Sequence, residues 1–309
     1  MQVVWMVLST FLFSTMGVCI KYASDSFNTA EIVFYRGLIG MAVLWWLSSS
    51  QGVSLKTKHP FMHVWRSVVG VTSMACWFYA LTQIPLASAM TLNYMSSLWI
   101  AVILLVAAAW TLRPSHTGPR QALNIPLVIT IAIGFAGVVL MLQPSFAQDQ
   151  TVPALIGLVS GLLSALAYMQ LAALARIGEP ESRTVFYFGL GSTLMGLAGM
   201  VVMGVSRWPG WQEALWLLPI GLLAAGGQIA LTKAYSSAKT QRGTLVAANL
   251  QYSGIVFASL YSIFLFGDEL GAAGWIGMAL IAGCGIAASI FRARGATQPA
   301  PAPAPHKAT

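Results

Sequence analysis

The sequence predicts an all-α integral membrane protein whose ten transmembrane helices form two inverted five-helix repeats. Three observations lead to this prediction: a low content of charge, ten long apolar stretches, and related motifs in the two halves of the chain. Of the 309 residues, 57% are hydrophobic and only 8% are charged, whereas a soluble domain has about 25% charged residues. Since a soluble surface needs charge to remain in water, the composition indicates that lipid surrounds most of this chain.

Ten stretches are long enough to cross a bilayer, which requires roughly 20 mainly apolar residues. Short polar or Gly/Pro-containing breaks separate them. We expect the transmembrane helices at 2–22, 32–50, 66–83, 87–111, 125–143, 153–175, 184–205, 213–236, 243–266 and 271–291. The first stretch has no basic residue before Lys21 and no clear cleavage site, so we interpret it as an uncleaved span rather than a signal peptide.

The basic residues predict how the chain is oriented in the membrane. If the N-terminus is cytoplasmic, 13 of the 16 Lys and Arg residues lie inside, and only Lys21, Arg36 and Arg207 lie toward the other side. Cytoplasmic loops carry an excess of Lys and Arg, so both termini are predicted to be cytoplasmic. Because the basic residues are spread between apolar segments, we expect no nucleic-acid partner. The Pro/Ala-rich tail at 295–309 is predicted to be a disordered cytoplasmic end.

The two halves of the chain share motifs in the same order. VFYRGL at 33–38 matches VFYFGL at 185–190 in five of six positions, at an offset of 152 residues. Further corresponding pairs are Thr10 with Ser160, Ser14 with Ser164, and Asn93 with Asn249. We therefore expect one repeat at 1–145 and a second at 150–292. Each repeat has five spans, an odd number, so the two must be inverted relative to each other, as is typical of transporters.

Three motifs carry a resemblance to a known family. EIVFYRG, which contains Arg36, opens the second span; ALTQIPLASAMTL leads into the fourth; and LFGDEL closes the ninth. With ten spans in two repeats, residues 1–292 resemble the EamA-like family of the drug/metabolite transporter superfamily. The resemblance implies transport of amino acids, vitamins, nucleoside-like compounds or drugs. Where this family often has a Glu-Pro pair early in spans four and nine, this chain has Tyr94-Met95 and Leu250-Gln251.

Polar side chains on one face of a membrane helix indicate the bundle interior, because they are costly in lipid. The candidates for a substrate cavity are Ser14, Arg36, Tyr79, Asn93, Ser97, Tyr168, Gln228, Asn249 and Tyr252. Backbone hydrogen bonding and close helix packing are the alternative explanations for the Ser positions. An aromatic belt at the membrane interface is the alternative for Tyr residues near helix ends. Aromatic and amide groups of this kind favour a polar organic substrate with a flat portion.

Arg36 is the most informative charge, since it lies more than one turn inside the second span. Its partner is expected to be Glu31 or a carboxylate or phosphate of the substrate, unless it extends to the outer surface. Arg66 and Lys233 lie near cytoplasmic ends, where they orient the chain. Glu31 and Lys233 are the candidates for coupling or charge interactions. No Asp or Glu lies at the centre of any span, which favours facilitated diffusion or exchange over proton coupling.

The leading hypothesis is a secondary transporter that moves a small organic metabolite across the bacterial inner membrane by alternating access. The alternatives are a membrane-embedded enzyme and a non-transporting receptor or scaffold. All four His residues lie in loops or the tail, and Cys19, Cys76 and Cys284 show no metal-binding spacing. We therefore expect no catalytic residues, no metal and no cofactor. Expected partners are the lipid bilayer and a small-molecule substrate, and the sequence allows a monomer or a homodimer.

Overall fold

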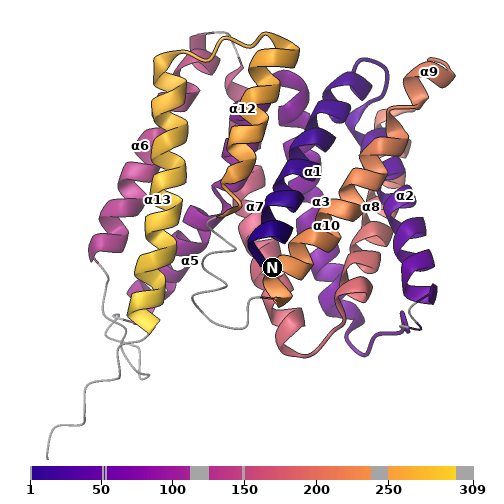
Figure 1. Ribbon diagram of the computed structural model, residues 1–309, viewed down its shortest axis with the longest axis horizontal. Helices are drawn as coiled ribbons and strands as arrows, with labels where there is room; N and C mark the ends of the chain where they lie inside the picture. Colours follow the sequence, from indigo (N-terminus) through magenta and orange to yellow (C-terminus); the bar gives the residue numbers. More distant parts are fainter. Residues whose placement is uncertain are drawn as a thin grey trace, which may run out of the picture.

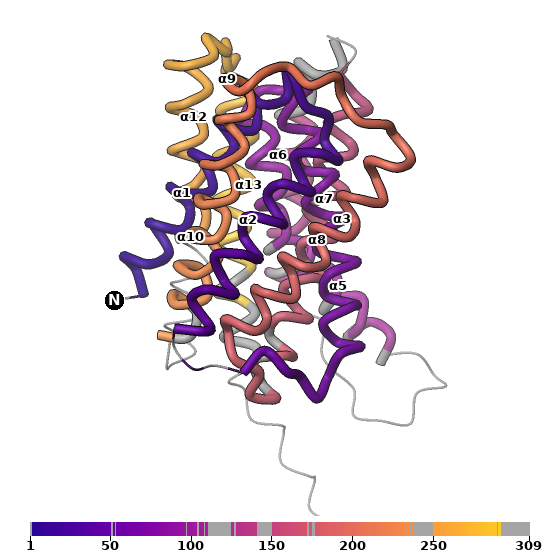
Figure 2. The backbone as a smooth tube through the Cα atoms, turned by 90° about the vertical axis from the view of Figure 1, so that its right-hand side faces the viewer, coloured from indigo at the N-terminus to yellow at the C-terminus, as the bar shows by residue number. Residues whose placement is uncertain are grey.

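The protein is a bundle of α-helices that run up and down between two ends (Figures 1 and 2). The computed structural model describes residues 2–50, 52, 54–111, 125–147, 150–237 and 250–296. The helices are α1 (Gln2–Ala23), α2 (Thr29–Ser50), α3 (Pro60–Gln83), α4 (Leu86–Tyr94), α5 (Ser96–Thr111), α6 (Ile125–Ala147), α7 (Thr151–Arg176), α8 (Glu181–Met203), α9 (Trp211–Ala214), α10 (Leu217–Ser236), α12 (Ser253–Phe266) and α13 (Ala272–Ala296). No β-strand occurs within these ranges.

Six helical segments in the described part are long and apolar enough to cross a membrane. They are Gln2–Ala23, Thr29–Ser50, Leu86–Ala107, Thr151–Leu171, Glu181–Met203 and Trp211–Ala234. Shorter apolar helices are Val128–Leu140, Ser253–Phe266 and Ala272–Ala288. Helix α3 falls outside both groups, and it carries His63, Arg66 and several hydroxyl side chains. The expectation of an all-helical, multi-pass membrane protein is confirmed.

Two of the expected continuous helices are interrupted. The expected span 87–111 is divided at Met95, whose N–H lies 3.2 Å from the Thr91 carbonyl oxygen and 3.3 Å from that of Leu92. The expected span 213–236 is divided between α9 and α10. Helix α12 begins at Ser253, while the first part of the expected span 243–266 and the tail at 295–309 fall largely outside the described residues. Backbone hydrogen bonds continue across both divisions, from the Trp99 N–H to the Met95 carbonyl oxygen and from the Ile220 N–H to the Trp216 carbonyl oxygen.

Proline and glycine account for several helix boundaries. Pro60 occupies the first turn of α3 and Pro180 directly precedes α8; at these positions the missing N–H costs no intrahelical hydrogen bond. Helix α12 ends at Gly267, whose φ of 63° is left-handed and therefore favours glycine. The Asp268 N–H then bonds to the Ser262 carbonyl oxygen at 3.0 Å. This turn explains why the LFGDEL motif closes the helix.

The main helix pairs each join the first and second halves of the chain. They are α2 with α8, α6 with α13, α1 with α10, and α3 with α7. Figure 1 shows α6 and α13 together at one edge of the bundle, away from α2 and α8. We call the end at which α1 begins the N-side and the end at which α1 ends the far side. Helix α2 therefore begins at the far side, whereas α8 begins at the N-side.

Candidate functional site

A cavity of about 80 Å³ lies between the two halves of the bundle. Its walls come from α1, α2, α3, α4, α7, α8 and α10, with Gln251 just before α12. The polar and charged lining residues are Ser9, Thr10, Arg36, Arg66, Ser73, Asn93, Tyr94, Ser164, Tyr168, Gln228 and Gln251. Ligand pockets commonly measure about 300–1,000 Å³. The cavity must therefore widen before it can hold a metabolite.

Asn93 joins the two halves on one side of the cavity. Its amide nitrogen donates to the hydroxyls of Ser160, at 3.1 Å, and Ser164, at 3.2 Å, both on α7. The Ser73 hydroxyl of α3 bonds to the Ser160 carbonyl oxygen and lies 2.7 Å from the Ser164 hydroxyl. Helices α3, α4 and α7 are thus connected at the break that follows α4.

A similar set of contacts lies where α1 meets α12. The Thr10 hydroxyl lies 2.8 Å from that of Ser253, and Ser14 donates to the Gly254 carbonyl oxygen at 3.1 Å. Ser9 donates to the Gly227 carbonyl oxygen of α10 at 2.8 Å. Thr10 and Ser14 are the residues that the sequence pairs with Ser160 and Ser164. Corresponding hydroxyls therefore make corresponding contacts, α1 with α12 and α7 with α4.

Two arginines extend into the cavity. Arg36 of α2 and Arg66 of α3 are 5% and 6% exposed, and both line its wall. Their guanidinium carbons lie 5.4 Å and 4.6 Å from the centre of the Phe188 ring. Gly70 leaves room for the Arg66 head, because a Cβ at this position would collide with the guanidinium. The interpretation of Arg66 as only an orienting charge is corrected, since burial on the inner face of α3 directs it inward.

The spacing of residues along α3 also indicates that Arg66 faces the bundle interior. Arg66, Gly70, Ser73 and Trp77 follow each other at i, i+4, i+7 and i+11, which places them on one face of α3. All four line the cavity. A face that combines a charge, a glycine, a hydroxyl and an indole N–H is unsuited to lipid. This face therefore belongs in the bundle interior, although Arg66 lies near the end of its span.

The other expected cavity residues are distributed unevenly. Tyr168 and Gln228 line the cavity, and the Tyr168 hydroxyl lies 3.4 Å from the Gln251 amide nitrogen. Ser14 is buried, with its hydroxyl bonded across to α12. Tyr252 is buried and packs against Gly285 of α13. Tyr79 is 37% exposed on α3 and is not part of the cavity wall. Asn249 and the side chain of Ser97 lie outside the described residues.

The two residues expected to carry coupling or charge interactions lie away from the cavity. Glu31 is 2% exposed at the far side, and its carboxylate accepts hydrogen bonds from the Asn28 N–H, the Ser206 N–H and the Ser206 hydroxyl. These contacts tie α2 to the segment after α8. Glu31 is therefore held by Asn28 and Ser206 rather than by Arg36. Lys233 is exposed on α10, with its ammonium group 4.8 Å from the centre of the Trp5 ring.

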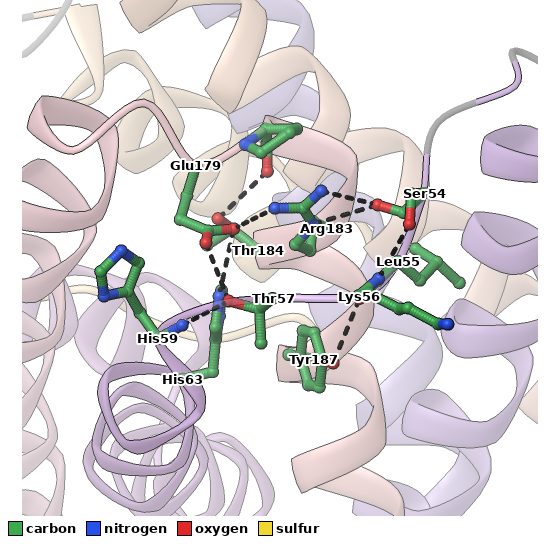
Figure 3. A network of polar contacts seen from close by, with 11 residues as sticks. Ser54, Leu55, Lys56, Thr57, His59, His63, Glu179, Arg183, Thr184 and Tyr187 are labelled. Atoms are coloured by element: carbon green, nitrogen blue, oxygen red, sulfur yellow. Dashed lines mark hydrogen bonds and ion pairs between the residues drawn. The ribbon is translucent and has the colours of Figure 1, made fainter.

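A second polar cluster joins the two halves of the chain at the N-side (Figure 3). Glu179, in the turn before α8, accepts hydrogen bonds from the Thr57 hydroxyl at 2.8 Å and from the Arg183 guanidinium at 2.9 Å. Arg183 also donates to the Ser54 carbonyl oxygen, and the His63 Nε2 lies 3.5 Å from Glu179. Burial opposes ionisation of Glu179, but the bonds from Thr57 and Arg183 outweigh it, so the carboxyl pKa lies below its ordinary value.

The far side also contains an ion pair. The Lys21 ammonium lies 3.7 Å from Asp268, whose carboxylate also accepts a hydrogen bond from Ser262. A polar hollow of about 360 Å³ surrounds Lys21 and Asp268, with Gln83 and Ser88 at its rim. Polar contacts between segments distant in sequence therefore lie at both ends of the bundle. The central cavity lies between them.

Apolar helices around a polar cavity that both halves of the chain line define a multi-pass membrane protein. The chain belongs to the EamA-like transporter family, whose sequence profile matches residues 1–143. It is 32% identical to the pseudopaline exporter CntI of Pseudomonas aeruginosa, over 85% of this chain and 87% of that protein. It is 27% identical to a riboflavin transporter of Rhizobium johnstonii, over 76% and 74% of the two chains. The protein is thus a small-metabolite transporter.

The fold is also found in a solved crystal structure. That structure has a TM-score of 0.63 and 20% sequence identity, and the match covers 96% of this chain and 99% of the other. At this identity the likeness concerns the fold alone. It extends over the second half of the chain as well, beyond the residues that the family profile matches.

Proposed function

We propose that the protein moves a small organic metabolite across the bacterial inner membrane by alternating access. Two five-helix repeats, 1–145 and 150–292, are inverted relative to each other and rock about the central cavity. The observation that carries this proposal is the position of the cavity, whose walls come from both halves. A site shared by two moving parts is opened to either side when they rotate against each other.

The helix contacts support the inverted repeat. In the proposed correspondence α1 matches α7, α2 matches α8, α3 matches α10 and α6 matches α13. If each helix is replaced by its counterpart in the other half, the contact of α1 with α10 becomes the contact of α7 with α3. The structure contains both contacts. The contacts of α2 with α8 and of α6 with α13 convert into themselves. This pattern is what a two-fold relation between two copies of one unit requires.

The proposed site includes the cavity-lining residues Arg36, Asn93, Tyr168 and Gln228, with Arg66 added. Ser14 and Tyr252 support the surrounding helix contacts. With both termini in the cytoplasm, the N-side is the cytoplasmic end, because 13 of the 16 basic residues then lie inside. Glu31 and Lys233 lie outside the cavity wall, and no acidic side chain lines it among the described residues. We therefore favour facilitated diffusion or exchange over proton coupling.

The test is transport by the purified protein in liposomes. Proteoliposomes and protein-free liposomes are incubated with a bacterial metabolite extract, and their contents are identified by mass spectrometry. Loading the extract inside, outside, or on both sides with one side isotopically labelled covers export, uptake and exchange. We expect specific compounds to move only where the protein is present, with or without an uncoupler. Absence of any protein-dependent movement would contradict the transporter proposal, and loss of movement with an uncoupler would contradict the mode of coupling.

A further inference from the structure

We propose that the transported metabolite is an organic anion whose carboxylate or phosphate groups bind Arg36 and Arg66 in the cavity. This inference rests on the proposed function and names the substrate class for that site. Both guanidinium groups lie within 5.4 Å of the centre of the Phe188 ring. One small anion with two oxyanion groups can therefore reach both.

The first argument is the balance of charge. The chain has eight Asp and Glu residues, and none of the described ones lines the cavity. Glu31, Glu179 and Asp268 are bonded to neighbours at the two ends of the bundle. The undescribed stretch 238–249 contains no acidic residue. Among the described residues, no carboxylate therefore lies beside these two buried positive charges, although buried charges are normally paired.

The second argument is the kind of hydrogen-bonding group that lacks a partner. The Nε atoms of Arg36 and Arg66 are buried and make no hydrogen bond, and the same holds for the indole Nε1 of Trp77. All three are donors without acceptor capacity, and all three side chains line the cavity. Buried donors left without acceptors cost free energy. An incoming oxyanion supplies the acceptors, and charge-assisted bonds from guanidinium groups are the strong kind.

The third argument concerns the rest of the molecule that would carry the anion. Phe13, Tyr168 and Trp77 contribute aromatic surface to the same cavity. An inorganic ion cannot use that surface, whereas an organic anion with a flat portion can. Widening of the cavity from about 80 Å³ then admits the substrate, while its charge neutralises the arginine pair.

The experiment uses the full-length protein in proteoliposomes with the same metabolite extract. We expect the transported compounds to carry a carboxylate or a phosphate. Mass spectrometry of the vesicle contents distinguishes these two groups. We also expect an excess of the transported compound to compete for transport. The derivative in which its carboxylate is replaced by a neutral amide should compete less strongly. Transport of only neutral or cationic organic compounds would overturn this inference and leave the transporter proposal intact, whereas transport of chloride or inorganic phosphate alone would overturn both.

The variants assign the effect to the arginines. Arg36→Gln and Arg66→Gln should each lower uptake of the anion by about tenfold or more. This is the effect expected when one hydrogen bond to a charged group is lost. Arg36→Lys and Arg66→Lys keep the charge and should retain more uptake than the Gln variants. Arg207→Gln removes the same charge from an exposed position and should leave uptake unchanged. If well-folded Gln variants transport like the parent protein, the arginines do not bind the substrate.

Discussion

The contacts of Asn93 predict a measurable loss of stability on a single substitution. Its amide bonds to Ser160 and Ser164 on the other half of the chain. Asn93→Ala removes both bonds, and interhelical hydrogen bonds in membrane proteins contribute about 0.6 kcal/mol on average and up to about 1.7. We expect a lower melting temperature in detergent micelles and slower transport at equal protein levels.

The matched control for Asn93 is a hydroxyl that bonds only within its own helix. Thr72 lies on the exposed face of α3 and donates to the Val68 carbonyl oxygen at 2.8 Å. Thr72→Ala should leave the melting temperature and transport close to those of the parent protein. If both variants behave alike, the bonds of Asn93 do not hold the halves together.

The cavity residues show how far single residues are predictable from a pattern. Arg36, Asn93, Tyr168 and Gln228 were expected in the cavity from polarity at helical spacing, and the structure lines the cavity with all four. Arg66 was assigned to orientation, because its place near a span end has an ordinary explanation. Tyr79 was expected inside but is 37% exposed. The direction in which α3 is rotated decides both outcomes, and tertiary packing fixes that rotation.

At the scale of helices, Gly37 predicts how closely α2 and α8 must approach. A Cβ at Gly37 would lie 2.6 Å from the backbone nitrogen of Thr193 on α8. Gly37→Ala forces the two helices apart, and overpacking of this kind costs about 1–3 kcal/mol. We expect a reduced melting temperature and reduced transport.

Gly40, three residues along α2, provides the control for Gly37. A Cβ at this position would meet no atom within 4 Å. Gly40→Ala adds the same methyl group to the same helix without a contact, and alanine favours helix over glycine. Thermal unfolding should show Gly40→Ala as stable as the parent protein or more so. A loss of stability equal to that of Gly37→Ala would argue against a close contact of α2 with α8.

The N-side cluster predicts a dependence of stability on pH. The pKa of Glu179 lies below its ordinary value of 4.5. A carboxyl with a lowered folded-state pKa stabilises the folded protein above its unfolded pKa, and this contribution is lost as the pH falls through the folded value. The melting temperature of Glu179→Gln should therefore be lower than that of the parent protein at pH 7, and the difference should shrink below about pH 4.

Glu181 provides the comparison for Glu179, because it is exposed two residues further along the chain. Glu181→Gln should change the melting temperature little at either pH. A difference for Glu179→Gln that stays constant from pH 7 down to about pH 3 would mean that the ionised carboxylate does not hold Thr57 and Arg183.

Helix positions were more predictable than helix continuity. The expected ranges agree with α1, α2, α7 and α8 to within a few residues, because twenty apolar residues have few other stable conformations in lipid. The break at Met95 was not expected, since SSLWIAV continues an apolar pattern without Pro or Gly. Contacts of α4 with α7 and α12 accompany the break. Such contacts between helices are not visible in the local sequence.

At the scale of the whole molecule, the polar contacts at the two ends predict how a cross-link at either end affects transport. Thr57 and Glu179 meet at the N-side, and Asn28 contacts Gly204 beside Ser206 at the far side. We replace Cys19, Cys76 and Cys284 by Ser and introduce either Thr57→Cys with Glu179→Cys or Asn28→Cys with Ser206→Cys. A reducible bifunctional thiol reagent joins each pair. Either lock should stop transport, because alternating access needs both ends to open in turn.

A reporter at Gln228→Cys, in the cavity wall, separates alternating access from a simple block. With the N-side locked, a membrane-impermeant thiol reagent should reach this position only from the far side, and with the far side locked only from the N-side. Single-cysteine versions of each pair should transport normally, and reduction of the lock should restore transport. Continued transport across a locked end, or labelling from that end, is incompatible with two halves that rock about a central site. Labelling from opposite sides would show that each end closes independently, which a fixed pore cannot do.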